Sequence, residues 1–173
     1  MPDSQFSSQD ERFMRRALEL AAVAESEGEV PIGAVLVKDG KIISEGWNRS
    51  IGQHDATAHA EVEVIRKAGR ALENYRLLDT TLYVTLEPCP MCAGALLHSR
   101  VKRVVFGASD LKAGAAGTVL DLFESQAAYH YAEVEKGLLE EECREVLQAF
   151  FKRRRKEIKE KKRQSRSDVE SKG

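Results

Sequence analysis

The chain has 173 residues, of which 42% are apolar and 32% charged, and its formal net charge is −1. This length and composition suit a single domain with a proper hydrophobic core, and no apolar run approaches the roughly 18 residues that a membrane span requires. Three cysteines, an odd number, argue against a disulfide framework. The N-terminal segment carries acids and no apolar stretch of the secretory kind, so we expect a cytoplasmic protein with no membrane partner.

The near-neutral net charge conceals an uneven distribution. From residue 151 to the end, 11 Lys and Arg stand against 4 Asp and Glu, which leaves 16 bases and 24 acids in the rest of the chain. Such a segment is either a solvated helical extension or a contact for a polyanion such as nucleic acid. We therefore expect a body, residues 1–151, followed by a basic helical extension with a disordered end, residues 152–173.

The first expected element is a helix that begins with a capping box at Ser8 and Glu11 and continues with apolar residues at helical spacing. Two strands rich in β-branched residues follow, joined by a tight turn at Asp39-Gly40. After a polar loop, residues 59–74 have the pattern of a second helix.

The middle of the chain has the pattern of a strand–helix–strand unit, over residues 80–88, 91–99 and 101–109. A short helix between two strands favours parallel pairing and hence an α/β fold. The glycine- and alanine-rich residues 110–123 are expected to form a loop, and from Gly137 onward the pattern is helical again.

Two of the three cysteines, Cys89 and Cys92, stand at C-x-x-C spacing at the start of the short helix. This spacing is compatible with a redox pair, half of a four-cysteine structural site or half of a mixed metal site. No second C-x-x-C is present, and Cys143 lies on an apolar helical stripe that is more typical of a core residue than of a ligand.

A further metal ligand would therefore be a histidine. His59 opens the second helix in the sequence "HAE", with Glu61 two residues later, whereas His54, His98 and His130 lie in less suitable contexts. Three protein ligands with water in the fourth position are typical of a catalytic zinc site. We expect His59 and the two cysteines to hold Zn²⁺, with Glu61 as a proton carrier beside it.

The combination of H-x-E with P-C-x-x-C is the signature of zinc nucleobase deaminases. Together with "EVPIGAVLV", "GWNR", "HDATAHAE", "GAAG" and "FFKRRRKEIK", it makes the chain resemble the bacterial tRNA adenosine deaminases over about Phe13 to Lys159. This resemblance implies a three-layer α/β/α sandwich of the cytidine-deaminase kind around a five-stranded mixed sheet, with helices on both faces. It also implies a homodimer with one Zn²⁺ in each subunit.

The reaction implied by the resemblance is hydrolytic deamination of adenosine to inosine at the wobble position, 34, of a tRNA anticodon. Zinc-activated hydroxide would attack C6 of the base while Glu61 shuttles the protons. The partner would be the anticodon stem-loop of a tRNA.

The resemblance also assigns substrate contacts. Asn48 would hydrogen-bond the flipped base, and Asp110 would lie near the target ribose. Phe150 and Arg153 would lie on the C-terminal helix that touches the anticodon loop. Ser109 departs from the family, which often has a basic residue at this position.

Two other functions are compatible with parts of the pattern. A deaminase of the same fold that acts on a free base or nucleotide would share the metal ligands and the glutamate, but it would have little use for the basic extension. A non-catalytic RNA-binding module with a structural zinc would need a fourth protein ligand and no glutamate beside the metal.

Overall fold

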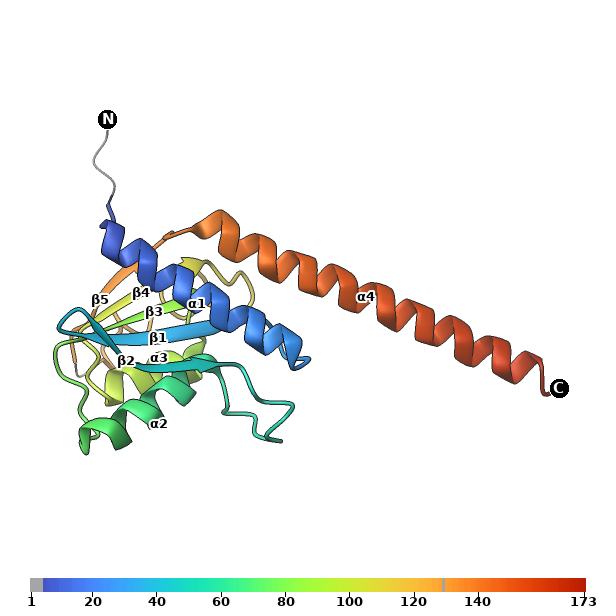
Figure 1. The fold of residues 1–173 in the computed structure, drawn as a ribbon, viewed down its shortest axis with the longest axis horizontal. Helices are drawn as coiled ribbons and strands as arrows, with labels where there is room; N and C mark the ends of the chain where they lie inside the picture. Colours follow the sequence, from blue (N-terminus) through green and yellow to red (C-terminus); the bar gives the residue numbers. More distant parts are fainter. Residues whose placement is uncertain (1–4, 129) are drawn as a thin grey trace.

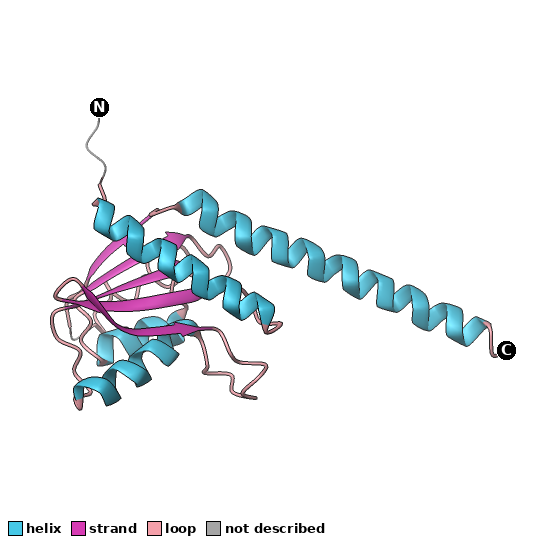
Figure 2. Cartoon of the chain, in the orientation of Figure 1, coloured by secondary structure: helices cyan, strands magenta, loops and turns pink. Residues whose placement is uncertain are grey.

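The protein is described by a computed structural model that covers residues 5–128 and 130–173. The N-terminal segment that lacks a secretory pattern begins outside the described residues. Five strands form one mixed sheet in the order β2-β1-β3-β4-β5 (Figures 1 and 2). The strands are β1 Gly33–Lys38, β2 Lys41–Trp47, β3 Thr80–Leu86, β4 Arg103–Ala108 and β5 Glu133–Lys136.

Helices cover both faces of this sheet, so the chain forms three layers (Figure 1). One face carries the first and last helices, and the opposite face carries the two middle ones. They are α1 Ser8–Ser26, α2 Ala60–Leu72, α3 Pro90–His98 and α4 Glu140–Glu170. Within the described residues, no helix combines the length and apolar composition that a membrane crossing requires. The predicted three-layer α/β/α sandwich with a five-stranded mixed sheet is confirmed.

Two hydrophobic clusters fill the spaces between the layers. Successive side chains of a strand point to opposite faces, so neighbours in β1 enter different clusters. Leu36 packs towards α2 and α3 with Val64, whereas Val35 packs towards α1 and α4 with Phe13. Because the sheet is buried on both faces, its central strands are apolar almost throughout and show little alternation.

The pairing of the strands agrees with the predicted turns. β1 and β2 form an antiparallel hairpin, and the two turn residues Asp39 and Gly40 both have positive φ, 51° and 74°. β3 and β4 pair in parallel around α3, as the strand–helix–strand pattern predicts. β5, which pairs in parallel with β4, has no counterpart in the predicted elements because it is short and mostly polar, with the sequence "EVEK".

The helix α1 begins one residue earlier than its sequence pattern predicts. Its capping box is made by Ser7 and Asp10, not by Ser8 and Glu11. The carboxylate of Asp10 also accepts hydrogen bonds from Tyr83 Oη at 2.6 Å and from Arg103 Nη1 at 2.9 Å. These long-range partners select Asp10, and the local sequence alone cannot distinguish the two registers.

The last helix, α4, has two different halves. Its first half packs on β4, where Cys143 is buried against Gly107 so closely that a Cβ at residue 107 would lie 2.3 Å from the sulfur. Cys143 is thus a core residue, as predicted, and burial raises the pKa of its thiol to about 12. The second half leaves the body and remains helical to Glu170, so the expected disordered end is helical over residues 165–170 (Figure 1).

The buried contact between α1 and the sheet generates a prediction about acid stability. Burial alone would raise the pKa of Asp10, but hydrogen bonds from Arg103, Tyr83 and Ser7 outweigh it and hold this pKa well below its usual range. We expect Asp10→Asn to lower the free energy of unfolding at neutral pH by about 2 kcal/mol, because the charge of Arg103 loses a buried partner.

The same variant should change how stability depends on pH. The stabilisation from Asp10 is complete above the unfolded pKa of about 3.9 and is lost as the pH falls towards the lower folded value. Urea unfolding between pH 7 and pH 2 should show a steeper acid loss for the native protein than for Asp10→Asn. Glu11→Gln, which removes an exposed carboxylate of the same helix, serves as the control, and parallel pH profiles for the native protein and Asp10→Asn would contradict the prediction.

Candidate functional site

The predicted site residues come from segments that meet at one edge of the sheet. The strand register pairs Gly33 with Trp47 and Leu86 with Ala108, so the end of β2, the start of β1 and the ends of β3 and β4 lie together. The carboxyl ends of parallel strands are a common place for ligand sites in α/β folds. This edge therefore brings together the segments that follow β2, β3 and β4.

Three potential metal ligands lie close together at this edge. His59 Nδ1 is 3.6 Å from Cys89 Sγ and 3.5 Å from Cys92 Sγ, and all three ligand atoms lie within 4.8 Å of one another. His59 is the N-cap of α2, and Cys89 is the N-cap of α3. Two helix N-termini thus face the same point, where their dipoles favour thiolate ligands.

The geometry of these donors suits zinc. Bonds of about 2.1 Å to nitrogen and 2.3 Å to sulfur at a tetrahedral angle place the two ligand atoms about 3.6 Å apart. The distances from His59 to Cys89 and Cys92 agree with this separation. One imidazole and two thiolates are also the soft and borderline ligands that zinc prefers.

The electrostatics of the cluster favour a bound cation as well. A hydrogen bond with Cys92, opposed by burial and supported by His59, lowers the pKa of Cys89 to about 4. The neighbouring Cys89 thiolate and burial, together with Glu61, raise the pKa of Cys92. The second thiol therefore resists ionisation beside the first, and a divalent cation between them removes that conflict.

Glu61 lies in the first turn of α2 and is buried, with 4% of its surface exposed. Burial raises the pKa of its carboxyl group, and a hydrogen bond with Cys92 partly offsets this effect. Glu61 is not a member of the group of potential ligands. Its position beside Cys92 allows it to exchange protons with a molecule bound at the cluster.

The remaining histidines are not members of the cluster. His54 and His98 are exposed, and His130 Nε2 lies 3.1 Å from the carbonyl oxygen of Val101. None of these residues belongs to the metal-ligand group found among the described residues.

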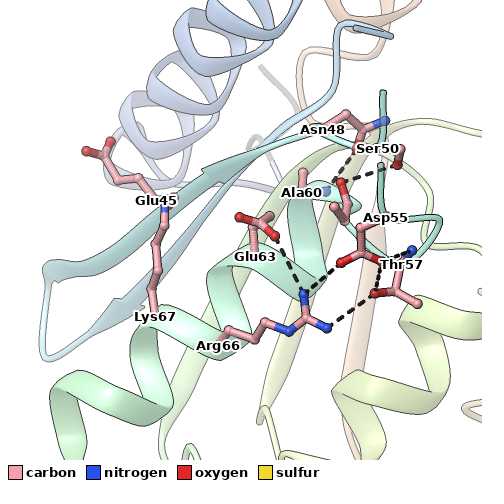
Figure 3. A network of polar contacts seen from close by, with 10 residues as sticks. Glu45, Asn48, Ser50, Asp55, Thr57, Ala60, Glu63, Arg66 and Lys67 are labelled. Carbon is pink, nitrogen blue, oxygen red and sulfur yellow. Dashed lines mark hydrogen bonds and ion pairs between the residues drawn. The ribbon is translucent and has the colours of Figure 1, made fainter. Parts of the chain in front are cut away.

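Asn48 holds the start of α2 in place. Its Oδ1 accepts a hydrogen bond from the backbone N–H of Ala60 at 2.9 Å, a contact drawn in Figure 3. His59, the N-cap residue, makes no side-chain capping bond of its own. The amide oxygen of Asn48 therefore satisfies the first N–H group of α2, while the imidazole, which makes no capping bond, faces the two cysteines.

The loop before α2 is fixed to the helix by a polar network. Arg66 Nη2 donates to Thr57 Oγ1 at 3.2 Å, and its Nη1 approaches Asp55 at 3.5 Å and Glu63 at 3.7 Å (Figure 3). Asp55 in turn accepts hydrogen bonds from the backbone N–H and the hydroxyl of Thr57. These contacts limit the movement of the segment that delivers His59.

Asp110 follows β4 and shapes the loop beside the cluster. Its Oδ1 accepts hydrogen bonds from the backbone N–H groups of Lys112 at 2.9 Å and Ala113 at 3.1 Å. Its own N–H donates to Glu87 Oε1 at 3.2 Å. Asp110 thus lies at the same sheet edge as the cluster, held by Glu87, the residue that follows the neighbouring strand β3.

Glu87 is a buried residue whose role the sequence pattern does not reveal. Its carboxylate accepts hydrogen bonds from the N–H groups of Asp110, Ala116 and Thr118 and from the hydroxyl of Thr118. A Cβ at Gly114 would come within 2.4 Å of this carboxylate, so only glycine lets the loop wrap so closely. The "GAAG" segment is therefore built around a single buried acid.

A second buried acid holds the other loop of the site. Glu29 accepts hydrogen bonds from the N–H groups of Ile51 at 3.1 Å and Gly52 at 2.7 Å. It therefore fixes the segment between β2 and α2 in the way that Glu87 fixes the segment after β4. The one sequence signal for both residues is a glutamate shortly before or directly after an apolar strand.

Phe150 is buried, whereas Arg153 is exposed but engaged in contacts with the body. Phe150 is 4% exposed, and Arg153 and Arg154 lie over its ring, so in this conformation the ring is not accessible to a nucleic acid. Arg153 pairs with Glu25 of α1 at 2.8 Å. The direct RNA contact expected of Phe150 therefore does not agree with its packing against the body.

The two buried acids predict separate effects on the two loops. Glu87→Ala should raise the exchange of the amide hydrogens of residues 110, 116 and 118 about tenfold, because their acceptor is removed. Glu29→Ala, the matched control, should instead raise exchange at residues 51 and 52. Hydrogen exchange measured by NMR distinguishes the two, and equal effects of both variants on both loops would show that neither acid acts locally.

Comparison with known proteins identifies the family. Residues 7–108 match the model of the cytidine and deoxycytidylate deaminase zinc-binding region. The tRNA-specific adenosine deaminase of Haemophilus influenzae is 58% identical over 151 residues, which cover 87% of each chain.

Solved structures agree with this match. One from studies of A-to-I editing by tRNA:A34 deaminases at the wobble position of transfer RNA has a TM-score of 0.77 and 46% identity, covering 79% of this chain and 99% of that one. Guanine deaminase from Bacillus subtilis is more distant, with a TM-score of 0.56 and 38% identity over 67% of this chain and 85% of that one. The chain therefore belongs to the zinc-binding cytidine and deoxycytidylate deaminase family, among its tRNA-specific adenosine deaminases.

Proposed function

We propose that this protein hydrolytically deaminates adenosine to inosine at the wobble position, 34, of a tRNA anticodon. The observation that carries the proposal is the cluster of His59, Cys89 and Cys92 with the buried carboxyl group of Glu61 beside it. Three donors with a neighbouring proton carrier suit a catalytic zinc site better than a structural one, which uses four protein ligands. The high identity to tRNA-specific adenosine deaminases supports adenosine in tRNA as the substrate.

Each residue has a defined part in this reaction. His59, Cys89 and Cys92 hold the ion, and bound zinc supplies the acidification of water that makes a nucleophile available near neutral pH. Glu61 takes a proton from that water and delivers protons to N1 and then to the amino group at C6. The oxygen of the water bonds to C6, the C6–N bond breaks and ammonia leaves, so the base becomes hypoxanthine.

The substrate-binding roles follow from position. Asn48 lies next to the start of α2, and we assign it to hydrogen bonding with the flipped base. Asp110 lies on the loop after β4, where we assign it to the neighbourhood of the target ribose. Both side chains already hold backbone N–H groups, so any loss on substitution includes a loss of local order.

The assembly and cellular setting are part of the proposal. We expect a homodimer with one zinc in each subunit, acting in the cytoplasm on the anticodon stem-loop. Residues 1–151 form the deaminase domain, and residues 152–173 form the basic extension. Light scattering and zinc analysis of the purified protein measure the assembly and the stoichiometry directly.

A deaminase of free bases is the nearest alternative, because guanine deaminase has the same fold. The basic second half of α4 favours RNA, since a small-molecule enzyme gains nothing from an extended cationic helix. Incubation with an anticodon stem-loop that carries adenosine at position 34, beside free guanine, cytosine and adenosine, tests the proposal. We expect inosine from the stem-loop, and deamination of a free base alone would overturn the substrate assignment.

The role of Glu61 can be separated from metal binding. Glu61→Gln should keep the zinc of the native protein and lower kcat by about 10²–10⁴-fold, because the proton carrier is lost and the ligands remain. His59→Ala, the control, should lose both zinc and activity. Loss of zinc from Glu61→Gln would show that Glu61 is itself a ligand.

A further inference from the structure

The second half of α4 carries a one-sided row of basic side chains. We define the basic stripe as Lys152, Arg155, Lys156, Lys159, Lys162, Arg163 and Arg166. At 3.6 residues per turn these positions fall within about a third of the helix circumference and cover about 21 Å of its length. Glu157 and Glu160, the two acids within the length of the stripe, fall outside this arc, and Glu170 on the same face lies one turn beyond its end. The positive charge is therefore concentrated on one face and not spread around the helix.

This face points away from the part of the body that α4 crosses. Arg153 pairs with Glu25 at 2.8 Å and Arg154 Nη2 lies 3.4 Å from the carbonyl oxygen of Gly28, so these two arginines mark the side that faces α1. The stripe lies on the opposite side, and every residue from 151 to 173 is exposed. Among the described residues, the side chains of the stripe have no ion-pair partner.

The stripe continues a groove at the functional edge of the sheet. The groove, of about 1080 Å³, lies between the loop after β4 and α4. Asp110 and Lys112 line it on the loop side, and Lys152 and Arg155 line it on the helix side. With Arg144 the groove has four cations against two acids, Asp110 and Glu140, so a surface of net positive charge runs from this groove along α4 and away from the body.

We propose that the basic stripe binds the phosphate backbone of the double-helical stem that adjoins the target loop of the RNA. The inference rests on the proposed function, because the target loop must enter the site at the sheet edge. An A-form duplex presents continuous rows of phosphates, which proteins bind by shape and charge without reading sequence. Seven cations spaced within one Debye length of their neighbours act together on such a row.

The composition of the stripe argues against an anionic membrane as the occupant. A helix that lies on a membrane buries an apolar face opposite its basic face. From residue 152 to the end, Ile158 and Val169 are the only large apolar residues. The helix therefore offers charge without an apolar face, which suits a solvated phosphate backbone.

Two double variants with equal charge test the proposal. Lys159→Gln with Arg163→Gln removes two charges from the stripe, whereas Lys161→Gln with Lys172→Gln removes two charges from outside it. Binding should be measured at several salt concentrations with two hairpins that share the target loop. One has a short stem, and the other has a stem longer by about one helical turn.

We expect the stripe variant to weaken binding of the long-stem hairpin and to lower the slope of log K against log salt by about 2, because each of the two removed cations neutralises about one phosphate. The short-stem hairpin and the control variant should show much smaller changes. Equal slopes for the two variants, or equal effects on both hairpins, would overturn the proposal.

The same variants separate this inference from the proposed function. If the stripe variant still forms inosine in the short-stem hairpin at the native kcat, the deaminase function holds whatever the binding result. If neither hairpin yields inosine with the native protein, the proposed function fails, and the binding slopes still decide whether the stripe contacts a duplex. A slope change with anionic vesicles and none with RNA would assign the stripe to a membrane and overturn the inference.

Discussion

The site depends on one constraint: two helix N-caps face each other across a single point. An N-cap side chain normally accepts a hydrogen bond from its own helix, but the His59 imidazole and the Cys89 thiol make no such bond. Asn48 takes over that role for α2, while Pro90 at the first position of α3 removes one of the N–H groups that would need a partner. Because Asn48 and Pro90 reduce the number of free N–H groups at the two helix ends, the side chains of His59 and Cys89 can face each other.

The loops around this point are ordered by buried acids, and the loop after β4 also packs Ala115 and Phe123 into the hydrophobic core. Glu29 and Glu87 each accept hydrogen bonds from the backbone of a different loop, so each loop is held through its N–H groups. This arrangement fixes each loop through its backbone and does not depend on the identity of most of its side chains. It also explains why the two carboxylates are buried although neither belongs to the cluster.

The sequence was sufficient to predict those parts of the molecule that carry local or motif-level signals. The tight turn at Asp39-Gly40 and the parallel strand–helix–strand unit were predicted correctly because their signals span few residues. The mutual approach of His59, Cys89 and Cys92 was expected from a motif whose two halves lie 30 residues apart. The roles of those residues and of Glu61 remain predictions that the proposed variants test.

Features that depend on long-range packing could not be predicted in the same way. The capping register of α1 is decided by Tyr83 and Arg103, which lie far from Asp10 in sequence. Most partners of Glu87 are backbone N–H groups of a loop. Every residue type except proline has this group, so the sequence does not show which residues bind the carboxylate. Phe150 was expected to contact RNA because the resemblance places it on the C-terminal helix that touches the anticodon loop, yet its ring is covered by Arg153 and Arg154.

Arg103 also bears on how the chain is completed during synthesis. Its guanidinium joins Asp10 from the first helix to Glu135 from the last strand, at 2.9 and 2.7 Å, so it connects the two ends of the domain across β4. Until β5 emerges, β4 is an uncovered edge strand with an apolar sequence and a cation that lacks half its partners. Edge strands of this kind are prone to pair with other chains. A nascent chain that stops short of residue 133 is therefore exposed to aggregation although every metal ligand has already been made.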